Sequence, residues 1–205
     1  MTAAPGGTTL PRTHWPAVLA ASLGGVAVGM NVGKVPLALP TLRDELGLSL
    51  VQAGWVSSML TTLAIVAALA FGLAAGRIGA LRMVLGGLAI SAVASAGGAL
   101  VPSGADPGFT VLLATRFFEG AGFLAVSVAG PALVSAAAAP ADRRFALSVW
   151  AAYMPAGAGL AMALSPLLLP TLGWRGLWVV TAAMLLLAAA LAWAQRQRYA
   201  PASAS

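Results

Sequence analysis

Long apolar runs alternate with short polar or turn-forming segments along most of the chain. Six runs are long and apolar, at residues 15–41, 51–75, 83–101, 109–139, 145–172 and 176–194. Each has about the ~20 residues that a helix needs to cross the hydrocarbon core of a bilayer. Segments with glycine, proline or charged residues separate them, at 42–50, 76–82, 102–108, 140–144 and 173–175. The pattern predicts an all-α integral membrane protein with six transmembrane helices.

The composition indicates that lipid, rather than water, surrounds most of this protein. Of its 205 residues, 60% are hydrophobic and 8% are charged, whereas a soluble domain has roughly 25% charged residues. A helix of a soluble bundle also needs a polar face, and the six apolar runs have almost none. We therefore expect the lipid bilayer to be the main partner of residues 15–194.

Basic residues gather on one side of this predicted topology. That side carries Arg12, Arg77, Arg82, Arg143, Arg144, Arg196 and Arg198, and the other side carries only Arg43 and Arg175. Because basic loops stay in the cytoplasm, we expect both termini to be cytoplasmic, in a bacterial inner membrane. Topology then explains the net charge of +6 better than nucleic-acid binding does. We interpret residues 1–14 as a disordered cytoplasmic tail, and 195–205 as a second tail or a truncated linker.

The chain lacks the residue sets that most catalytic and metal sites require. It has no cysteine and one histidine, His14, which lies in the N-terminal tail. Neither a nucleophile–base arrangement, a phosphate-binding loop nor a group of metal ligands is present in the sequence. We therefore expect no enzyme activity, no cofactor and no metal site.

Three charged residues, Lys34, Arg116 and Glu119, lie inside the predicted spans. Lys34 is nine residues before Arg43, or roughly 14 Å from the outer boundary at ~1.5 Å per residue. Arg116 and Glu119 follow the start of the fourth span by seven and ten residues, which places them ~10–15 Å deep. The three residues thus share one level, and we expect a cluster between the first and fourth helices. Asn31, one helical turn from Lys34, is a further candidate member.

Two interpretations of these charges stay open at this point. Lys34 can extend its long side chain to the outer interface, and Arg116 with Glu119 can form a structural pair one turn apart. Alternatively, charges within a membrane are costly and often mark a pathway for substrate or ions. In that interpretation Lys34, Arg116 and Asn31 hold a polar or anionic solute, and Glu119 carries protons.

Glycine, proline and tryptophan recur at positions that predict packing, bending and anchoring. Gly25, Gly29 and Gly33 repeat every four residues, as in helices that approach closely in lipid. Pro155 and Pro166 predict kinks in the fifth span. The tryptophans fall near predicted span ends, which is typical of an interfacial aromatic belt; they are Trp15, Trp55, Trp150, Trp174, Trp178 and Trp193.

Several motifs together resemble the major facilitator superfamily of transporters. The fourth span begins with Arg116-x-x-Glu119-Gly120-x-Gly122, similar to that family's Arg-x-x-Gln-Gly-x-Gly. The segment 72–82 resembles its loop between helices two and three, and Gly173-Trp174-Arg175 matches a feature that opens helix six. The resemblance implies gating or motif roles for Gly72, Arg77, Gly79, Arg82, Gly120 and Gly122.

The sequence departs from the family pattern at three positions and in length. Gly76 replaces an aspartate of the gate-latching charge network, Leu81 replaces a basic residue, and Glu119 replaces the usual glutamine. Family members have two six-helix halves around a central site, and this chain resembles the N-terminal half. Its helices one to three and four to six would then form a 3+3 inverted repeat.

Two functions from different classes remain. The first is a secondary active transporter, or its N-terminal half, that moves a small solute by alternating access with proton coupling as an option. The stretch from Asn31 to Pro36 is faintly similar to cyanate/nitrite-type bacterial members. The second is a truncated or non-transporting membrane protein that binds a partner, either a second six-helix half or another copy of itself.

Overall fold

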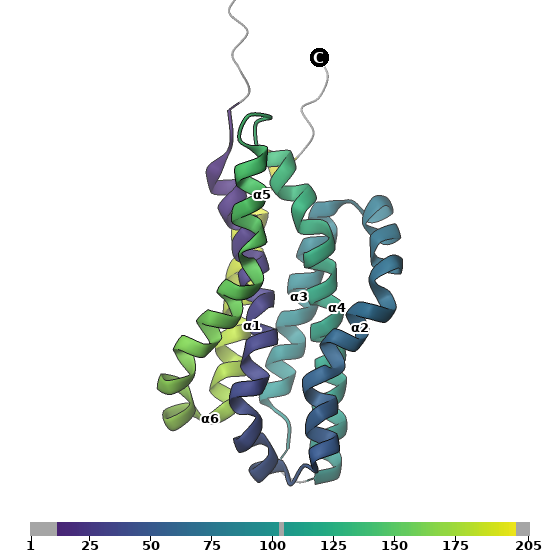
Figure 1. Ribbon diagram of the computed structural model, residues 1–205, viewed down its shortest axis with the longest axis vertical. Helices are drawn as coiled ribbons and strands as arrows, with labels where there is room; N and C mark the ends of the chain where they lie inside the picture. The colour runs from purple at the N-terminus through teal and green to yellow at the C-terminus, as the bar shows by residue number, and fades with distance from the viewer. Residues whose placement is uncertain (1–11, 103–104, 200–205) are drawn as a thin grey trace, which may run out of the picture.

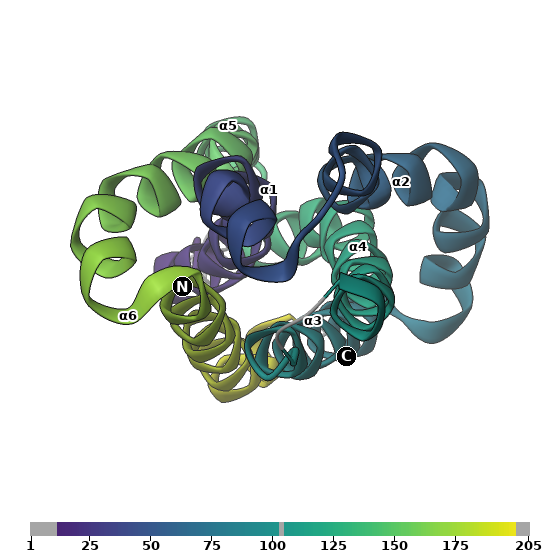
Figure 2. The ribbon, with the colours of Figure 1, turned by 90° about the horizontal axis from the view of Figure 1, so that it is seen from below.

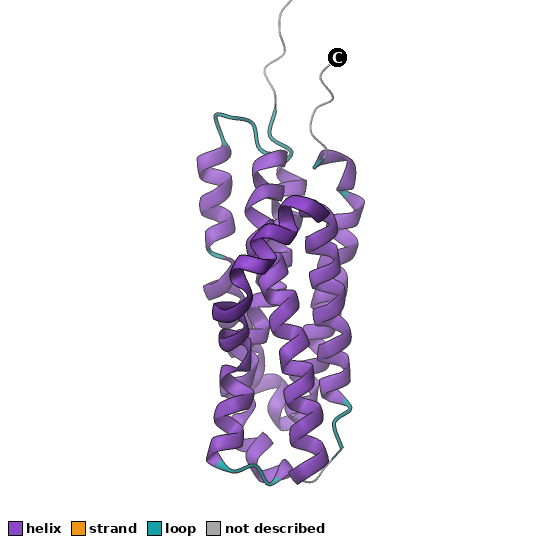
Figure 3. Cartoon of the chain, turned by 90° about the vertical axis from the view of Figure 1, so that its right-hand side faces the viewer, coloured by secondary structure: helices purple, strands orange, loops and turns teal. Residues whose placement is uncertain are grey.

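The structure, a computed structural model, describes residues 12–102 and 105–199 as an elongated helical bundle (Figures 1 and 3). Its elements are α1 (Trp15–Leu46), α2 (Leu50–Ile78), α3 (Ala80–Ala99), α4 (Ala105–Ala137), α5 (Arg143–Ala151), α6 (Tyr153–Ala194) and a 3-10 helix, η1 (Arg196–Arg198). The described residues contain no strand. Five segments are long and apolar enough to span a membrane: α1, α2, α3, Gly108–Ala137 of α4, and Arg143–Ala194. The predicted all-α membrane architecture is confirmed.

Glycine and serine determine where α1 ends and α2 begins. The sequence predicted that the first span stops at residue 41, but α1 continues through its charged end to Leu46. Gly47 then adopts a left-handed conformation with φ of 65°, which glycine tolerates because it lacks a Cβ atom. Ser49 caps α2 in a reciprocal arrangement with Gln52. The charges at the end of α1 are therefore helical rather than part of a loop.

The fifth and sixth predicted spans differ most from the structure. Instead of a three-residue break at 173–175, one residue, Gly173, has non-helical dihedral angles, with φ of 63° and ψ of −170°. The ribbon of α6 turns back there (Figures 1 and 2). A second interruption, at Ala152, separates α5 from α6. Pro155 lies three residues later and cannot donate to the carbonyl of Ala151, which accounts for this interruption.

Small residues bring α1 and α6 into close backbone contact. A Cβ atom on Gly29 would lie 2.9 Å from the carbonyl oxygen of Tyr153 and 3.2 Å from the Cα atom of Gly157. A Cβ atom on Gly33 would lie 2.8 Å from the Cα atom of Ala158. Any larger side chain would push the two helices apart. The close helix packing predicted for the repeated glycines of the first span is confirmed, and the structure shows that the partner is α6. Pro166, the second expected kink, lies within α6 together with Pro170.

The aromatic belt was predicted for all six tryptophans, and for three of them the prediction is wrong. Trp150, Trp174 and Trp178 are buried in the bundle, whereas Trp55 and Trp193 are about half exposed. Trp174 and Trp178 pack edge to face with ring centroids 5.3 Å apart. Trp174 and Trp178 lie near the start of the predicted sixth span because α6 turns at Gly173 and then runs into the bundle. Large aromatic rings fill the space between α1, α3 and α6 there.

Among the long helices, α2 contributes least to the interior of the bundle. Its first part contacts α4, where Leu60 lies against Gly120. Further along, Ile65, Val66 and Leu69 are each nearly 80% exposed, and Figures 1 and 2 show this part of α2 apart from the other helices. One apolar face of α2 is therefore uncovered by the described residues.

Candidate functional site

A network of three buried charges lies between α1 and α4. The Lys34 Nζ atom donates to the Glu119 Oε1 atom at 2.5 Å, and Arg116 forms an ion pair with the other oxygen of the same carboxylate. The three side chains are 0–1% exposed. One carboxylate thus joins two cations in a region without water contact. The structure brings together the three charged residues that the sequence placed at one level.

Neighbouring backbone and side-chain groups hold this network in place. Arg116 and Glu119 are one turn apart on α4, so both project toward α1. The Arg116 Nη2 atom donates to the backbone carbonyl oxygen of Asn31 at 3.0 Å. The Lys34 Nζ atom also donates to the Ser95 Oγ atom at 2.7 Å. Extension of Lys34 to the outer interface is therefore wrong for this structure, because its amine is bound inside the bundle.

Asn31 takes part through its backbone rather than through its side chain. Its side-chain amide is fully buried, and neither its oxygen nor its nitrogen has a partner among the described residues. The Nε atom of Arg116 and the indole nitrogen of Trp178 have none there either. A buried polar group without a partner costs roughly 1–3 kcal/mol. These groups are donors and an acceptor that a small polar molecule or water can use.

Three site residues were missed by the sequence analysis: Ser91, Ser95 and Trp178. Ser95 accepts from Lys34 and donates to the backbone carbonyl of Trp178 at 3.1 Å, so it links α1 to α6 through α3. Ser91 donates to the backbone carbonyl of Glu119 at 3.4 Å. The Lys34 amine lies 4.4 Å from the centroid of the Trp178 ring, a cation–π arrangement. Two serines four residues apart in an apolar helix were the one available sequence signal.

The two motif glycines after Glu119 position α4 against its neighbours. A Cβ atom on Gly120 would lie 3.2 Å from the Cα atom of Leu60 on α2. A Cβ atom on Gly122 would overlap the Ser91 side chain and the carbonyl oxygen of Gly87 on α3. Gly122 leaves no room for a side chain between α4 and α3, and Gly120 makes a tight approach of α4 to α2. The motif therefore fixes the position of Glu119 by close packing.

The other predicted motif residues lie outside this network. Gly72 and Arg77 are in the last part of α2, Gly79 forms the turn with φ of 88°, and Arg82 is in the first turn of α3. Arg82 precedes Ser91 by nine residues, which corresponds to roughly 14 Å along a helix. The structure thus separates the α2–α3 turn from the buried charges.

The buried network pairs one carboxylate with two cations, an arrangement that allows a second anion to compete for them. As drawn, Glu119 satisfies both cations, and a second anion would compete with its carboxylate for them. Removing one partner of a buried pair leaves an uncompensated charge at high cost. Loss of the Glu119 charge by protonation would therefore favour entry of another anion beside Lys34 and Arg116. In this arrangement anion binding and the charge of Glu119 are linked.

Five long apolar helical segments and a charge network within them define a multi-pass membrane protein. Residues 21–205 match the family model described as Major Facilitator Superfamily, and the chain belongs to that superfamily. It is 29% identical over 167 residues to the Methylenomycin A resistance protein of Streptomyces coelicolor. The match covers 80% of this chain and 34% of that protein. The chain therefore spans about a third of the length of this relative.

Proposed function

We propose that this chain forms one six-crossing half of a secondary active transporter that moves a small solute by alternating access. Membership of the Major Facilitator Superfamily supports this proposal. The reversal of the ribbon at Gly173 supports a sixth crossing, because it divides the segment Arg143–Ala194 into two limbs. Each limb is long enough to cross a bilayer.

The observation that carries the proposal is the buried ionic network of Lys34, Arg116 and Glu119. Two cations and one carboxylate, each 0–1% exposed, are poor devices for stability, because desolvation offsets their attraction. Their net positive charge favours an anionic solute. We propose that the solute binds Lys34 and Arg116 with help from the free side-chain amide of Asn31. Glu119 takes up a proton when the solute displaces its carboxylate.

A charge-neutral substitution at Glu119 tests this coupling. In the complete transporter, reconstituted in proteoliposomes, Glu119→Gln should reduce proton-coupled uptake while retaining a side chain of the same shape. Glu45→Gln is the matched control, because Glu45 pairs with Arg175 at the outer end of the bundle. Proton coupling that is unchanged in Glu119→Gln would reject the proton-carrier role.

The direction of transport and the solute class can be tested separately. The similar Streptomyces protein is named for resistance to methylenomycin A, which favours export of a small toxic compound. Expression of the complete transporter in a strain sensitive to methylenomycin A should then raise the concentration of this compound that the strain tolerates. The similarity of residues 31–36 to cyanate/nitrite-type members remains a sequence-based prediction, and uptake of these two anions is the corresponding assay.

We propose that the α2–α3 turn acts as a cytoplasmic gate and that both termini lie in the cytoplasm of a bacterial cell. Gly79 makes the turn with a positive φ, and Gly72 has open space around it. Pro155 and Pro166 would supply flexibility in the part of α6 that precedes Gly173. Since the chain contains no cysteine, single cysteines at Arg77 and Arg175 give a direct labelling test. Only the Arg77 position should be protected from impermeant reagents in intact cells.

A non-transporting role as a partner-binding membrane protein is the second candidate. The uncovered face of α2, with Ile65, Val66 and Leu69 nearly 80% exposed, favours contact with another helical body. That body is either a second six-helix half or another copy of this chain. Light scattering of the purified chain in detergent gives its oligomeric state, which, together with solute binding, distinguishes the non-transporting role from transport. A monomer that binds no solute supports a non-transporting protein, whereas a dimer with solute binding supports transport.

A further inference from the structure

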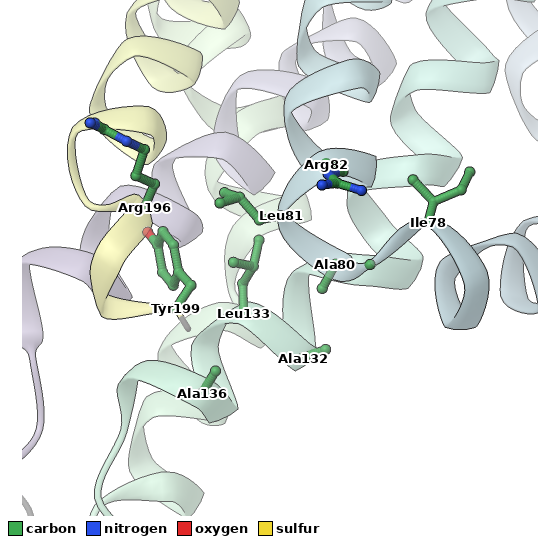
Figure 4. Close-up of a pocket in the computed structure, with 10 residues that line it drawn as sticks. Ile78, Ala80, Leu81, Arg82, Ala132, Leu133, Ala136, Arg196 and Tyr199 are labelled. Carbon is green, nitrogen blue, oxygen red and sulfur yellow. The ribbon is translucent and has the colours of Figure 1, made fainter. Parts of the chain in front are cut away.

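A pocket of about 350 Å³ lies beside the α2–α3 turn, at the end of the bundle opposite the outer ion pair. Its wall combines the turn, one face of α4 and the segment after α6. The lining residues are Ile78, Gly79, Ala80, Leu81, Arg82, Ala132, Leu133, Ala136, Arg196 and Tyr199 (Figure 4). We call it the turn pocket. Neither the ionic network nor the proposed solute path uses any of these residues; Gly79 and Arg82 belong to the motif at the α2–α3 turn.

The two arginines of the turn pocket flank an apolar floor. Figure 4 shows Arg82 and Arg196 on opposite sides, with Leu81 and Leu133 between them. Both arginines are exposed, and no lining residue is acidic. Arg82 has no hydrogen bond or ion pair with another residue of the described ranges. Its guanidinium donors are therefore used by none of the described residues, and the exposed group can bind a ligand.

The second arginine is held by its own helix end. The Arg196 guanidinium lies 4.8 Å from the ring centroid of Trp193 and donates to that residue's carbonyl oxygen at 3.2 Å. The remaining donors of the fork stay available, because a guanidinium has five N–H groups. Tyr199 closes the same side, and its hydroxyl donates to the carbonyl of Ala17 at 2.8 Å. The Arg196 and Tyr199 side of the pocket is thus held by contacts within the bundle.

We propose that the turn pocket binds the headgroup of an anionic phospholipid. Arginine suits phosphate because its planar fork matches the oxygen geometry. The exposed alanines of α4, Ala132 and Ala136, continue the apolar floor along a membrane helix, where a lipid's glycerol and acyl chains would lie. Further arginines at this end of the bundle add long-range attraction for an anionic surface; they are Arg77, Arg143, Arg144 and Arg198.

Lipid binding can be measured on the 205-residue chain by native mass spectrometry in detergent. The probes are phosphatidylglycerol, zwitterionic phosphatidylcholine and inorganic phosphate. Phosphatidylglycerol should bind more tightly than phosphatidylcholine. Arg82→Gln and Arg196→Gln should each weaken phosphatidylglycerol binding about fivefold. The matched controls Arg77→Gln and Arg198→Gln remove the same charge from the same end but do not line the pocket. Their affinity for phosphatidylglycerol should fall less than that of either pocket variant, because they lose only long-range attraction.

A variant that fills the pocket tests its shape without changing its charge. Ala132→Leu places a larger side chain on an exposed position of α4, so the fold should persist, as thermal unfolding in the same detergent checks. It should weaken phosphatidylglycerol binding with both arginines intact. Equal losses in all four arginine variants would overturn the proposal in favour of diffuse attraction. Equal affinity for phosphatidylcholine, or full competition by inorganic phosphate, would overturn it as well.

Discussion

Two ion pairs join α1 to other helices in opposite surroundings. Lys34 and Glu119 meet inside the bundle with no exposed surface, whereas Glu45 and Arg175 meet at its outer end with about a third of each side chain exposed. Both pairs are supported by tryptophan, through Trp178 inside and Trp174 outside. The difference lies in desolvation, which is large for the inner pair and small for the outer one.

The outer pair is a structural clasp made at little cost. Arg175 donates to the carbonyl oxygen of Val101 at 3.0 Å, and the Trp174 indole donates to Glu45 at 2.7 Å. These bonds tie the ends of α1 and α3 to the part of α6 that directly follows Gly173. The inner network carries a much larger desolvation penalty, because its three charges are buried away from water. The comparison supports the proposed transport role of the inner charges and indicates a structural role for the outer ones.

The largest expected effect comes from removing the shared carboxylate. Glu119→Ala leaves Lys34 and Arg116 as neighbouring buried cations without an anion. Breaking a buried pair in this way should lower the free energy of unfolding by ~3–5 kcal/mol. Denaturant unfolding in detergent micelles measures it, with Glu45→Ala as the control at the outer pair. Similar losses in the two variants would remove the distinction between the pairs.

Replacing the whole inner network should restore most of that stability. The triple variant Lys34→Met, Arg116→Met, Glu119→Leu exchanges three charges for apolar side chains of comparable volume. Such exchanges are often neutral or stabilising, so we expect stability within ~1–2 kcal/mol of the native chain. Solute transport by the complete protein should be lost. A triple variant as unstable as Glu119→Ala would mean that the charges themselves hold the bundle together.

An effect smaller than that of Glu119→Ala is expected from the serine that links the inner network to α6. Ser95→Ala removes the acceptor of Lys34 and the donor to the Trp178 carbonyl. Loss of a hydrogen bond to a charged group should lower the free energy of unfolding by ~1.5–3 kcal/mol. Ser148→Ala is the control, because this exposed serine bonds only the carbonyl of Arg144 on its own helix. Equal losses of unfolding free energy for both serines would show that the bonds of Ser95 to Lys34 and Trp178 do not stabilise the bundle more than an exposed serine does.

The smallest effect is expected at the outer pair. Glu45→Gln keeps an acceptor for the Trp174 indole and removes only the charge that Arg175 meets. Partly exposed pairs contribute ~0–1 kcal/mol, and screening shortens the Debye length to ~3 Å at 1 M salt. The stability difference from the native chain should therefore shrink as salt is raised. A difference that persists in high salt would indicate that this pair is shielded from solvent.

The buried network could be anticipated from the sequence to an unusual degree. Counting residues from the span ends placed Lys34, Arg116 and Glu119 at one level, because a helix rises by a constant amount per residue. The packing role of Gly29 followed from spacing alone. Ser95 could not be found in this way, because nothing in a single helix indicates which neighbour its hydroxyl faces.

The boundaries of the last helices show the opposite case. Counting apolar residues predicted spans 145–172 and 176–194 but not the interruption at Ala152, nor that Gly173 alone makes the turn. Trp174 and Trp178 were assigned to the interface because they lie near a span end. They are buried because that end enters the bundle between α1 and α3. Distance along the chain does not report depth within the protein.

The sequence by itself determined that lipid surrounds most of the protein, that the fold is helical and that charges are rare within the spans. Those properties depend on composition and on the fixed geometry of the helix, and both are local. Tertiary structure alone decided that one carboxylate serves two cations, that Lys34 turns inward to Ser95, and that Asn31 contributes its carbonyl instead of its amide. Those outcomes depend on how α1, α3, α4 and α6 are rotated against one another. Rotation is set by close contacts at residues such as Gly29 and Gly122, which only the packed bundle brings together.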